Sequence, residues 1–222
     1  MDGINYKIYI GYDSTEEIAA EVCKFSIESR SRFKTQFLNS SEIKGYARCI
    51  QEPQSTDFTF SRFWVPYLSN YTGYSIFVDC DFLFLHDIDE LFSIARLNDT
   101  AVSVVKLPEY VPRSSVKMNN VPQHRSYRKN WASLMVFDNS KCRNLTPDYL
   151  INITPGIKLH HFEWVSDSEI GSIPIEWNVL DEYDFETIPK AIHYTDGGPW
   201  FENHQNTYYS HMWKEELKKW KS

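Results

Sequence analysis

The sequence is poor in cysteine and glycine, with four and eight residues in 222, and it lacks long apolar runs and an excess of basic side chains. The cysteines are far apart and none has the paired spacing of a zinc site, so we expect reduced thiols in or near the core. No apolar run is long enough to span a membrane, and the amino terminus lacks the charged and apolar regions of a signal peptide, which favours a cytoplasmic location. The net charge of −7 argues against nucleic acid as a partner, because proteins that bind it need basic faces to displace counterions.

The scarcity of glycine also excludes one class of nucleotide site. A strand is predicted over 7–12 and a helix over 15–29, and the turn between them has no glycine-rich fingerprint for a dinucleotide. Ser14 and Glu17 have the spacing of a capping box for this helix, and we expect its inward face to carry Ile18, Val22 and Phe25.

Aromatic residues are abundant instead, at 16%, with seven Trp and fourteen Tyr. Such rings offer flat surfaces for packing or for ring-shaped ligands such as sugars and bases. Further strands are predicted over 35–38, 74–78, 101–106 and 133–137, with helices over 59–69, 88–95 and 208–221, an extended segment over 173–178 and a long loop over 107–128. We therefore expect a single α/β domain with a mixed, mostly parallel sheet flanked by helices.

Two carboxylates interrupt the apolar run in the middle of the chain. Asp79 and Asp81 follow the predicted strand 74–78 directly, at positions i and i+2. Burying two carboxylates this close together requires a counter-charge, and a divalent cation is the simplest one. Asp13 follows the first strand in the same way, so the carboxyl ends of the strands should carry the function.

A metal held by Asp79 and Asp81 needs further ligands, and the best candidate is His193. It follows the short apolar strand Ala191-Ile192 and precedes Gly197-Gly198, whose backbone amides would allow a phosphate to approach closely. Taken alone, a histidine in this context is more often a hydrogen-bonded core residue, and an Asp-x-Asp sequence is common by chance. The metal-site interpretation therefore depends on the histidine and the Asp-x-Asp sequence occurring in the same chain.

The order of Asp13, Arg62, Asp79-x-Asp81 and His193 resembles that of the GT-A glycosyltransferases, most closely the family that includes glycogenin and bacterial lipooligosaccharide galactosyltransferases. Four segments carry the resemblance, over 7–27, 60–92, 173–178 and 193–200. The chain is also similar to the amino-terminal domain of a large glycosyltransferase that algal viruses use on capsid glycans. That would place it in the host cytoplasm and beside further domains of a larger protein.

The resemblance implies a single GT-A (Rossmann-like) domain over 1–222, with a nucleotide-binding part of about 1–106 and an acceptor-side part of about 107–222. Asp13 would contact the uracil ring, and Arg62, projecting from its helix, would help to fix the nucleotide. Manganese (or magnesium) would be held by Asp79 and Asp81, with His193 completing the site. The other nucleotide-binding residues would be Gly11, Tyr12, Cys80, Gly197 and Gly198. The implied reaction moves a hexosyl or deoxyhexosyl group from a UDP-sugar to a glycan or glycoprotein acceptor.

The chain departs from the family pattern on the acceptor side. The family usually has a lysine before the late Pro-Trp, where this chain has Gly198, so another cation must face the diphosphate. Arg113, Arg125 and Arg128 are candidates, although they are equally compatible with ordinary solvated charges.

The strand that reads Phe-Asn-x-Gly in the family is here Trp131-Ala132-Ser133, and the family's Asp-Gln-Asp is represented only by Asp167-Ser168-Glu169. An inverting enzyme needs a catalytic carboxylate on this side, for which Asp167 and Glu169 are the candidates. A retaining enzyme, as in the family named, needs only polar groups around the departing phosphate, and the sequence does not decide between the two.

Two other functions fit parts of the pattern. A phosphohydrolase of the haloacid dehalogenase type also has an Asp-x-Asp after an apolar strand and uses the first Asp as nucleophile, but its motif lies on the first strand. A non-enzymatic sugar-binding module would use aromatic platforms such as Trp64, Trp164 and Trp200, although most such residues belong to cores. The glycosyltransferase hypothesis accounts for more features of the sequence than either alternative.

Overall fold

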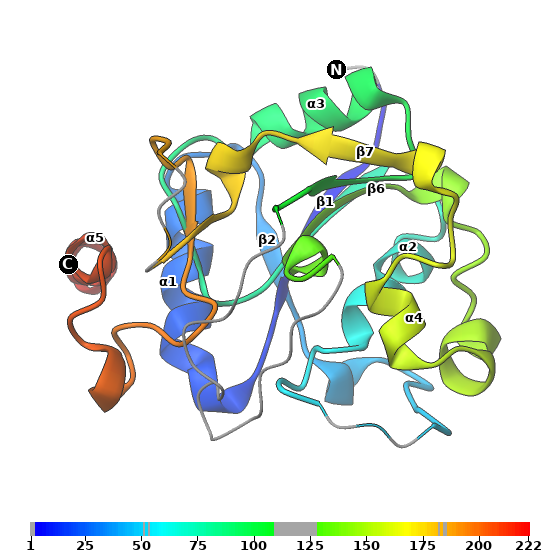
Figure 1. The fold of residues 1–222 in the computed structure, drawn as a ribbon, viewed down its shortest axis with the longest axis horizontal. Helices are drawn as coiled ribbons and strands as arrows, with labels where there is room; N and C mark the ends of the chain where they lie inside the picture. The colour runs from blue at the N-terminus through cyan, green and yellow to red at the C-terminus, as the bar shows by residue number, and fades with distance from the viewer. Residues whose placement is uncertain (1–2, 51, 53, 109–127, 182, 184–185) are drawn as a thin grey trace.

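The computed structural model describes residues 3–50, 52, 54–108, 128–181, 183 and 186–222, which form a six-stranded sheet, a smaller three-stranded sheet and flanking helices (Figure 1). The strands are β1 (Tyr6–Gly11), β2 (Thr35–Leu38), β3 (Tyr74–Val78), β4 (Phe82–Phe84), β5 (Val102–Val105), β6 (Leu134–Asp138), β7 (Ile170–Ile173), β8 (Val179–Leu180) and β9 (Ala191–His193). The α-helices are α1 (Glu17–Glu28), α2 (Val65–Leu68), α3 (Asp89–Asn98), α4 (Gly156–His160) and α5 (Ser210–Lys221).

The larger sheet has the order β2-β1-β3-β6-β5-β7, and among these described strands only β6 runs against the others. Val78 at the end of β3 pairs with Ile10 of β1 on one side and with Leu134, the first residue of β6, on the other. The carboxyl ends of β1, β3, β5 and β7 therefore share one edge of the sheet. This confirms the predicted α/β domain with a mixed, mostly parallel sheet.

The smaller sheet, β4-β9-β8, joins two segments that are far apart in the sequence. Phe82 of β4 pairs with His193 of β9, and the amide of Tyr194 donates to the carbonyl of Asp81 at 3.0 Å. Because β4 begins immediately after Asp81, this pairing carries the end of β9 to the carboxyl edge of β3.

The helices cover both sheets. The helix α3 packs on β6 and β7, while α1 packs against β4 and against the C-terminal helix α5, which lies outermost in Figure 1. None of the helices described is both long and apolar enough to cross a bilayer. Side chains of β3 and β6 are almost entirely buried, which explains their continuous apolar sequences.

The first helix differs from the prediction in its cap and in its buried face. Asp13, rather than Ser14, is the capping residue, because its side chain accepts from the amide of Thr15 at the start of a 3₁₀ turn over Ser14–Glu16. Val22 is buried as expected, whereas Ile18 and Phe25 are only partly buried. The inner face consists mainly of small side chains, which allows close approach to β4: Ala19, Ala20, Cys23 and Ser26.

Other differences concern short elements. The single helix predicted over 59–69 is a 3₁₀ turn, Ser61–Trp64, followed by α2, because Pro66 lacks an amide hydrogen and fits only a first helical turn. The segment predicted as extended contains a 3₁₀ turn over Ile175–Trp177. Of the long loop predicted over 107–128, the part at 109–127, including Arg113 and Arg125, lies outside the described residues.

Three of the four cysteines are buried free thiols, as expected, but Cys49 is exposed.

Candidate functional site

The two aspartates and the late histidine meet at the carboxyl edge of the larger sheet. One ligand atom from each of Asp79, Asp81 and His193 lies within 4.8 Å of the others. The position of Asp79 is set by β3 and by its amide, which donates to the carbonyl of Ser133 at 2.9 Å, while His193 is carried by β9. Two carboxylates and an imidazole form a suitable set of ligands for a divalent cation.

The hydrogen bonds of His193 fix which ring nitrogen is available. Its Nδ1 lies 2.9 Å from Oδ1 of Asn178, whose amide nitrogen donates to the carbonyl of Asn130. Since Oδ1 of Asn178 can only accept, the hydrogen bond is donated by Nδ1 of His193, and Nε2 is the ring nitrogen that faces Oδ2 of Asp81, at 3.4 Å. An imidazole nitrogen and carboxylate oxygens that face one another in this way are typical ligands of a divalent cation. The donor set therefore fits a metal, and Asn178, which was not among the predicted site residues, orients its imidazole.

Arg62 acts on Asp79 and does not project from its helix into the site as expected. Its guanidinium is 2.9 Å from Oδ1 of Asp79 and donates to the carbonyl of Ala132 at 2.9 Å. The side chain is only 6% exposed and lies over the rings of Phe58 and Phe77. Arg62 thus supplies a buried positive charge next to Asp79 of the metal cluster.

Asp13 lies at the same edge but has its carboxylate largely engaged. One oxygen accepts from the amide and hydroxyl of Thr15, at 2.9 and 2.7 Å, and the other accepts from the amide of Asp57 at 3.0 Å. These bonds hold the turn after β1 against the loop before the buried Phe58. Any contact of Asp13 with a base would be made in addition to this structural role.

A fourth carboxylate, Glu16, lies beside the cluster and was missed in the sequence. It is only 2% exposed, and its Oε2 has no hydrogen-bond partner. Burial, followed by the negative charges of Asp81, Asp13 and Asp79, raises the pKa of this carboxyl to about 8, with a smaller opposing effect from the Trp200 indole. Nothing in the sequence distinguishes Glu16 from its neighbour Glu17, which is exposed.

The segment after β9, residues 194–200, is called the late loop. Gly197 has a φ of +115°, and its amide donates to the carbonyl of Tyr194 at 2.8 Å. A Cβ added to Gly198 would lie 2.0 Å from the ring of Trp200, so this glycine is needed for the indole to pack on the backbone. The two predicted glycines are therefore fixed in place beside the cluster by their own packing.

Packing within the protein accounts for the other predicted nucleotide residues, Gly11, Tyr12 and Cys80. Cys80 is fully buried, and burial raises the pKa of its thiol well above the ordinary value, so its side chain points into the core. A Cβ on Gly11 would meet the ring of Phe58 at 2.5 Å, which explains the glycine by packing. Tyr12 is half-buried with its ring against Phe37.

Asp167 and Glu169, the predicted catalytic carboxylates, do not join this cluster. They precede β7, which runs parallel to β5, so they lie at the opposite edge of the sheet from Asp79. Asp167 is 78% exposed and pairs with Arg128 at 2.6 Å, while Glu169 closes a capping box with Ser166. The pairing also engages Arg128, the one predicted diphosphate cation within the described residues.

Of the three proposed aromatic platforms, Trp64 and Trp164 are buried in the core and only Trp200 is partly exposed. A hollow of about 350 Å³ lies beside the late loop, lined by Gly197 and by polar residues of 202–207 together with Asp181, Tyr194 and Asp196. Within it, Nδ1 of His204 and Oγ1 of Thr207 are buried without a hydrogen-bond partner. The lining of the hollow is mostly polar, which suits a hydroxylated ligand.

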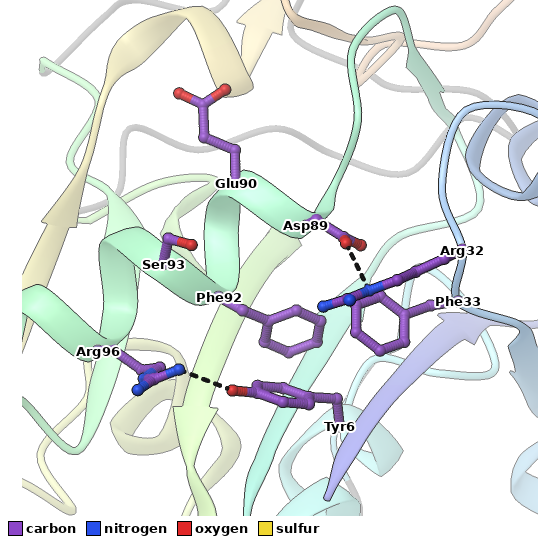
Figure 2. Close-up of a pocket in the computed structure, with 8 residues that line it drawn as sticks. All are labelled: Tyr6, Arg32, Phe33, Asp89, Glu90, Phe92, Ser93 and Arg96. Carbon is purple, nitrogen blue, oxygen red and sulfur yellow. Dashed lines mark hydrogen bonds and ion pairs between the residues drawn. The ribbon is translucent and has the colours of Figure 1, made fainter. Parts of the chain in front are cut away.

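A second hollow, of about 240 Å³, lies away from the cluster, near the start of β1 (Figure 2). Its arginines already have partners, as Figure 2 shows: Arg32 pairs with Asp89 at 2.9 Å, and Arg96 donates to the hydroxyl of Tyr6 at 3.1 Å. This hollow lies at the opposite edge from Asp79 and offers no comparable chemistry.

The comparisons with known proteins agree with this geometry. No family model matches the sequence. A curated relative, Protein CDI of Arabidopsis thaliana, is 38% identical over 228 residues, which cover 97% of this chain and 87% of the relative.

Two solved structures are similar in fold. The WbbM bifunctional glycosyltransferase in its apo form matches with a TM-score of 0.63 and 14% identity over 97% of this chain, which spans 50% of the WbbM chain. The galactosyltransferase LgtC, in complex with donor and acceptor sugar analogs, matches with a TM-score of 0.59 and 13% identity over 96% of this chain and 95% of its own. A glycosyltransferase involved in glycosylation of the major capsid of PBCV-1 is also among the matches, but its TM-score of 0.49 is too low to show a shared fold.

At such low identities the solved structures show the fold alone, and they confirm the predicted GT-A architecture. The sequence identity to the plant protein is much higher, at 38%, and it extends over nearly the whole of both chains. The chain has the GT-A glycosyltransferase fold and belongs to the family of Protein CDI.

Proposed function

We propose that the protein is a metal-dependent glycosyltransferase that moves a sugar from a nucleotide sugar, in the first instance a UDP-sugar, to a glycan or glycoprotein acceptor. The observation that carries the proposal is the convergence of Asp79, Asp81 and His193 at the carboxyl edge of a GT-A sheet. The two carboxylates and Nε2 of His193 would hold manganese or magnesium.

The residues around the cluster prepare these ligands. Arg62 holds one oxygen of Asp79, and Asn178 holds the imidazole of His193 so that its Nε2 faces Asp81. When bound, the divalent ion would stabilise the negative charge that builds up on the departing nucleoside diphosphate. Gly197 and Gly198 would offer their backbone to this diphosphate, in a loop too closely packed to accept larger residues.

The hollow beside Gly197 supports the binding of a sugar next to this loop. Its lining contains carboxylates, amides and a histidine but no lysine or arginine among the described residues, so it suits neutral hydroxyl groups better than a second phosphate. Since Asp167 and Glu169 lie at the other edge of the sheet, neither carboxylate supports an inverting mechanism. A reaction that relies on polar groups around the departing phosphate fits better.

The phosphohydrolase alternative has less support. It requires Asp79 as a nucleophile, whereas one oxygen of Asp79 is bound by Arg62 and the motif follows β3 rather than the first strand. The sugar-binding alternative also has less support, because two of its three proposed platforms, Trp64 and Trp164, are buried in the core.

Calorimetry with UDP tests the proposal. We expect UDP to bind in the presence of manganese, to bind far more weakly without it, and to lose binding in an Asp81→Ala variant. Glu215→Ala, which removes an exposed acid from α5, is the matched control and should bind normally.

Binding that is independent of metal, or an absence of binding, would contradict the proposal. A screen of UDP- and GDP-sugars for manganese-dependent hydrolysis then identifies the donor. Phosphate release from a generic phosphomonoester would instead support the phosphohydrolase, and sugar binding without nucleotide would support the binding module.

A further inference from the structure

Glu16 is a buried carboxylate near the metal cluster to which the proposed mechanism gives no task. It ends the 3₁₀ turn after β1, directly before α1, and its amide donates to the carbonyl of Asp13 at 3.0 Å. It therefore lies at the carboxyl edge that β1 shares with β3 and Asp79, and it is only 2% exposed. Burying a carboxyl group among three others is unfavourable, and its Oε2 lacks a partner as well. Such a group is unexpected unless another ligand of the site compensates for it.

Glu16 is not placed to bind the ion directly. The ligand atoms that lie within 4.8 Å of one another come from Asp79, Asp81 and His193, and Glu16 is not among them. Three protein ligands leave positions on a divalent ion for phosphate oxygens and water. A water molecule bound to the ion carries two polarised O–H groups, which are the donors that an unpartnered carboxylate oxygen requires.

Glu16 also faces the late loop through Trp200. The indole of Trp200 lies close enough to affect the pKa of Glu16, and the same ring packs on the backbone of Gly198. Glu16 therefore stands between the metal cluster and the loop that would follow the diphosphate.

We infer that Glu16 is a positioning residue of the metal site, whose carboxyl accepts a hydrogen bond from a water molecule bound to the ion and so strengthens binding of the ion. The inference rests on the proposed metal site, and it adds a residue from α1 to ligands that come from the strands. Its oxygen orients a water molecule of the ion, and loss of such an outer partner typically lowers metal affinity by about 10- to 100-fold.

Glu16→Met tests the inference, because methionine has nearly the same length but no oxygen that accepts a hydrogen bond from water. Manganese alone, without nucleotide, is titrated by calorimetry into the wild-type chain, Glu16→Met and the control Glu17→Met, whose side chain is exposed one residue further on. We expect about tenfold or greater weakening for Glu16→Met and none for Glu17→Met. Without metal, Glu16→Met should melt at the same or a higher temperature than the wild type, because it replaces a buried carboxyl that has an unpartnered oxygen by an apolar side chain.

The pairing of lower metal affinity with undiminished stability separates this role from a structural one. Equal manganese affinity in Glu16→Met and the wild type would overturn the inference and leave the proposed function intact. A wild-type chain that does not bind manganese would overturn both. A Glu16→Met chain that is destabilised or unfolded without metal would assign Glu16 to folding and would likewise overturn the inference.

Discussion

His160 shows how the surroundings of a single residue, away from the metal cluster, give it an unusual pKa. Its ring meets the rings of Phe60 and Phe63 edge-on, with centroids 6.1 and 5.2 Å apart. Burial, followed by the positive charge of Arg62, lowers the pKa of His160 to about 3 from 6.5. The imidazole is therefore neutral in the folded chain throughout the physiological range.

This charge state predicts a contribution of His160 to acid instability. Between pH 6.5 and 3 the unfolded chain takes up a proton at His160 that the folded chain does not, so stability is full above pH 6.5 and falls as the pH falls towards 3. In His160→Phe, the drop in free energy of unfolding between pH 6.5 and 4.5 should be smaller by roughly 2 kcal/mol. Urea unfolding of both proteins at each pH measures this, and the difference between them cancels groups that they share.

Parallel pH dependences in the two proteins would show that His160 titrates normally.

At the residue scale, the sequence identified the candidate metal ligands and missed the residues that support them. Asp79, Asp81 and His193 have side chains whose chemistry indicates a metal, and the structure brings them together. Asn178 and Glu16 carry no such signal, because their importance arises from burial and from a neighbour distant in the sequence. Arg62 was noticed, but only the structure shows that it is turned inward.

At the scale of the element, the late loop depends on a backbone conformation that side chains rarely adopt. Gly197 has a φ of +115°, and an added Cβ would also lie 3.1 Å from the ring of His204. Gly45 has a positive φ of +79° as well, but nothing lies within 4 Å of its Cβ position. The two glycines thus differ in surroundings while sharing the backbone requirement.

Gly197→Ala should therefore destabilise the loop and weaken UDP binding in the presence of manganese. Strain of this kind typically costs 1–3 kcal/mol, so binding should weaken by about tenfold if the strain is relieved by moving the loop. Gly45→Ala is the matched control, since it introduces the same kind of backbone strain in an exposed turn where the Cβ position is open. Calorimetry measures UDP affinity in both, and equal affinities would show that the loop takes no part in nucleotide binding.

Element prediction succeeded where one physical cause dominated. The strands over 35–38 and 74–78 were predicted to the residue, because short β-branched and aromatic runs ended by turn residues have few other solutions. The helix over 59–69 failed because all of Ser61–Trp64 are buried, so tertiary packing decides their conformation. The strands β4 and β8 are too short to show any periodicity, and only their pairing with β9 defines them.

At the scale of the whole molecule, the C-terminal helix is connected to the candidate site through a second hydrophobic cluster. Trp213 of α5 packs there with Val22 of α1, Leu83 of β4, and Ile192 and Tyr194 around the end of β9. Its ring centroid is also 5.4 Å from that of Trp200 in the late loop. The sequence predicted the helix but could not show this connection, because it joins segments from both ends of the chain.

Loss of Trp213 should therefore affect both the stability of the fold and the binding of nucleotide. Trp213 is 3% exposed, and replacing such a buried ring by alanine typically costs about 3–5 kcal/mol. With Trp200 and Tyr194 loosened, Trp213→Ala should also bind UDP about tenfold more weakly in the presence of manganese. Manganese alone should bind normally, because β3, β4 and β9 still hold its three ligands.

Trp213→Phe keeps an aromatic ring in the cluster and should lie between the wild type and Trp213→Ala in both properties. Urea unfolding and calorimetry at a temperature where all three chains are folded measure the two effects separately. Weakened UDP binding together with unchanged manganese binding would place the effect in the late loop. If Trp213→Ala lost stability but bound UDP like the wild type, α5 would only cover the fold, and the late loop would keep its conformation without it.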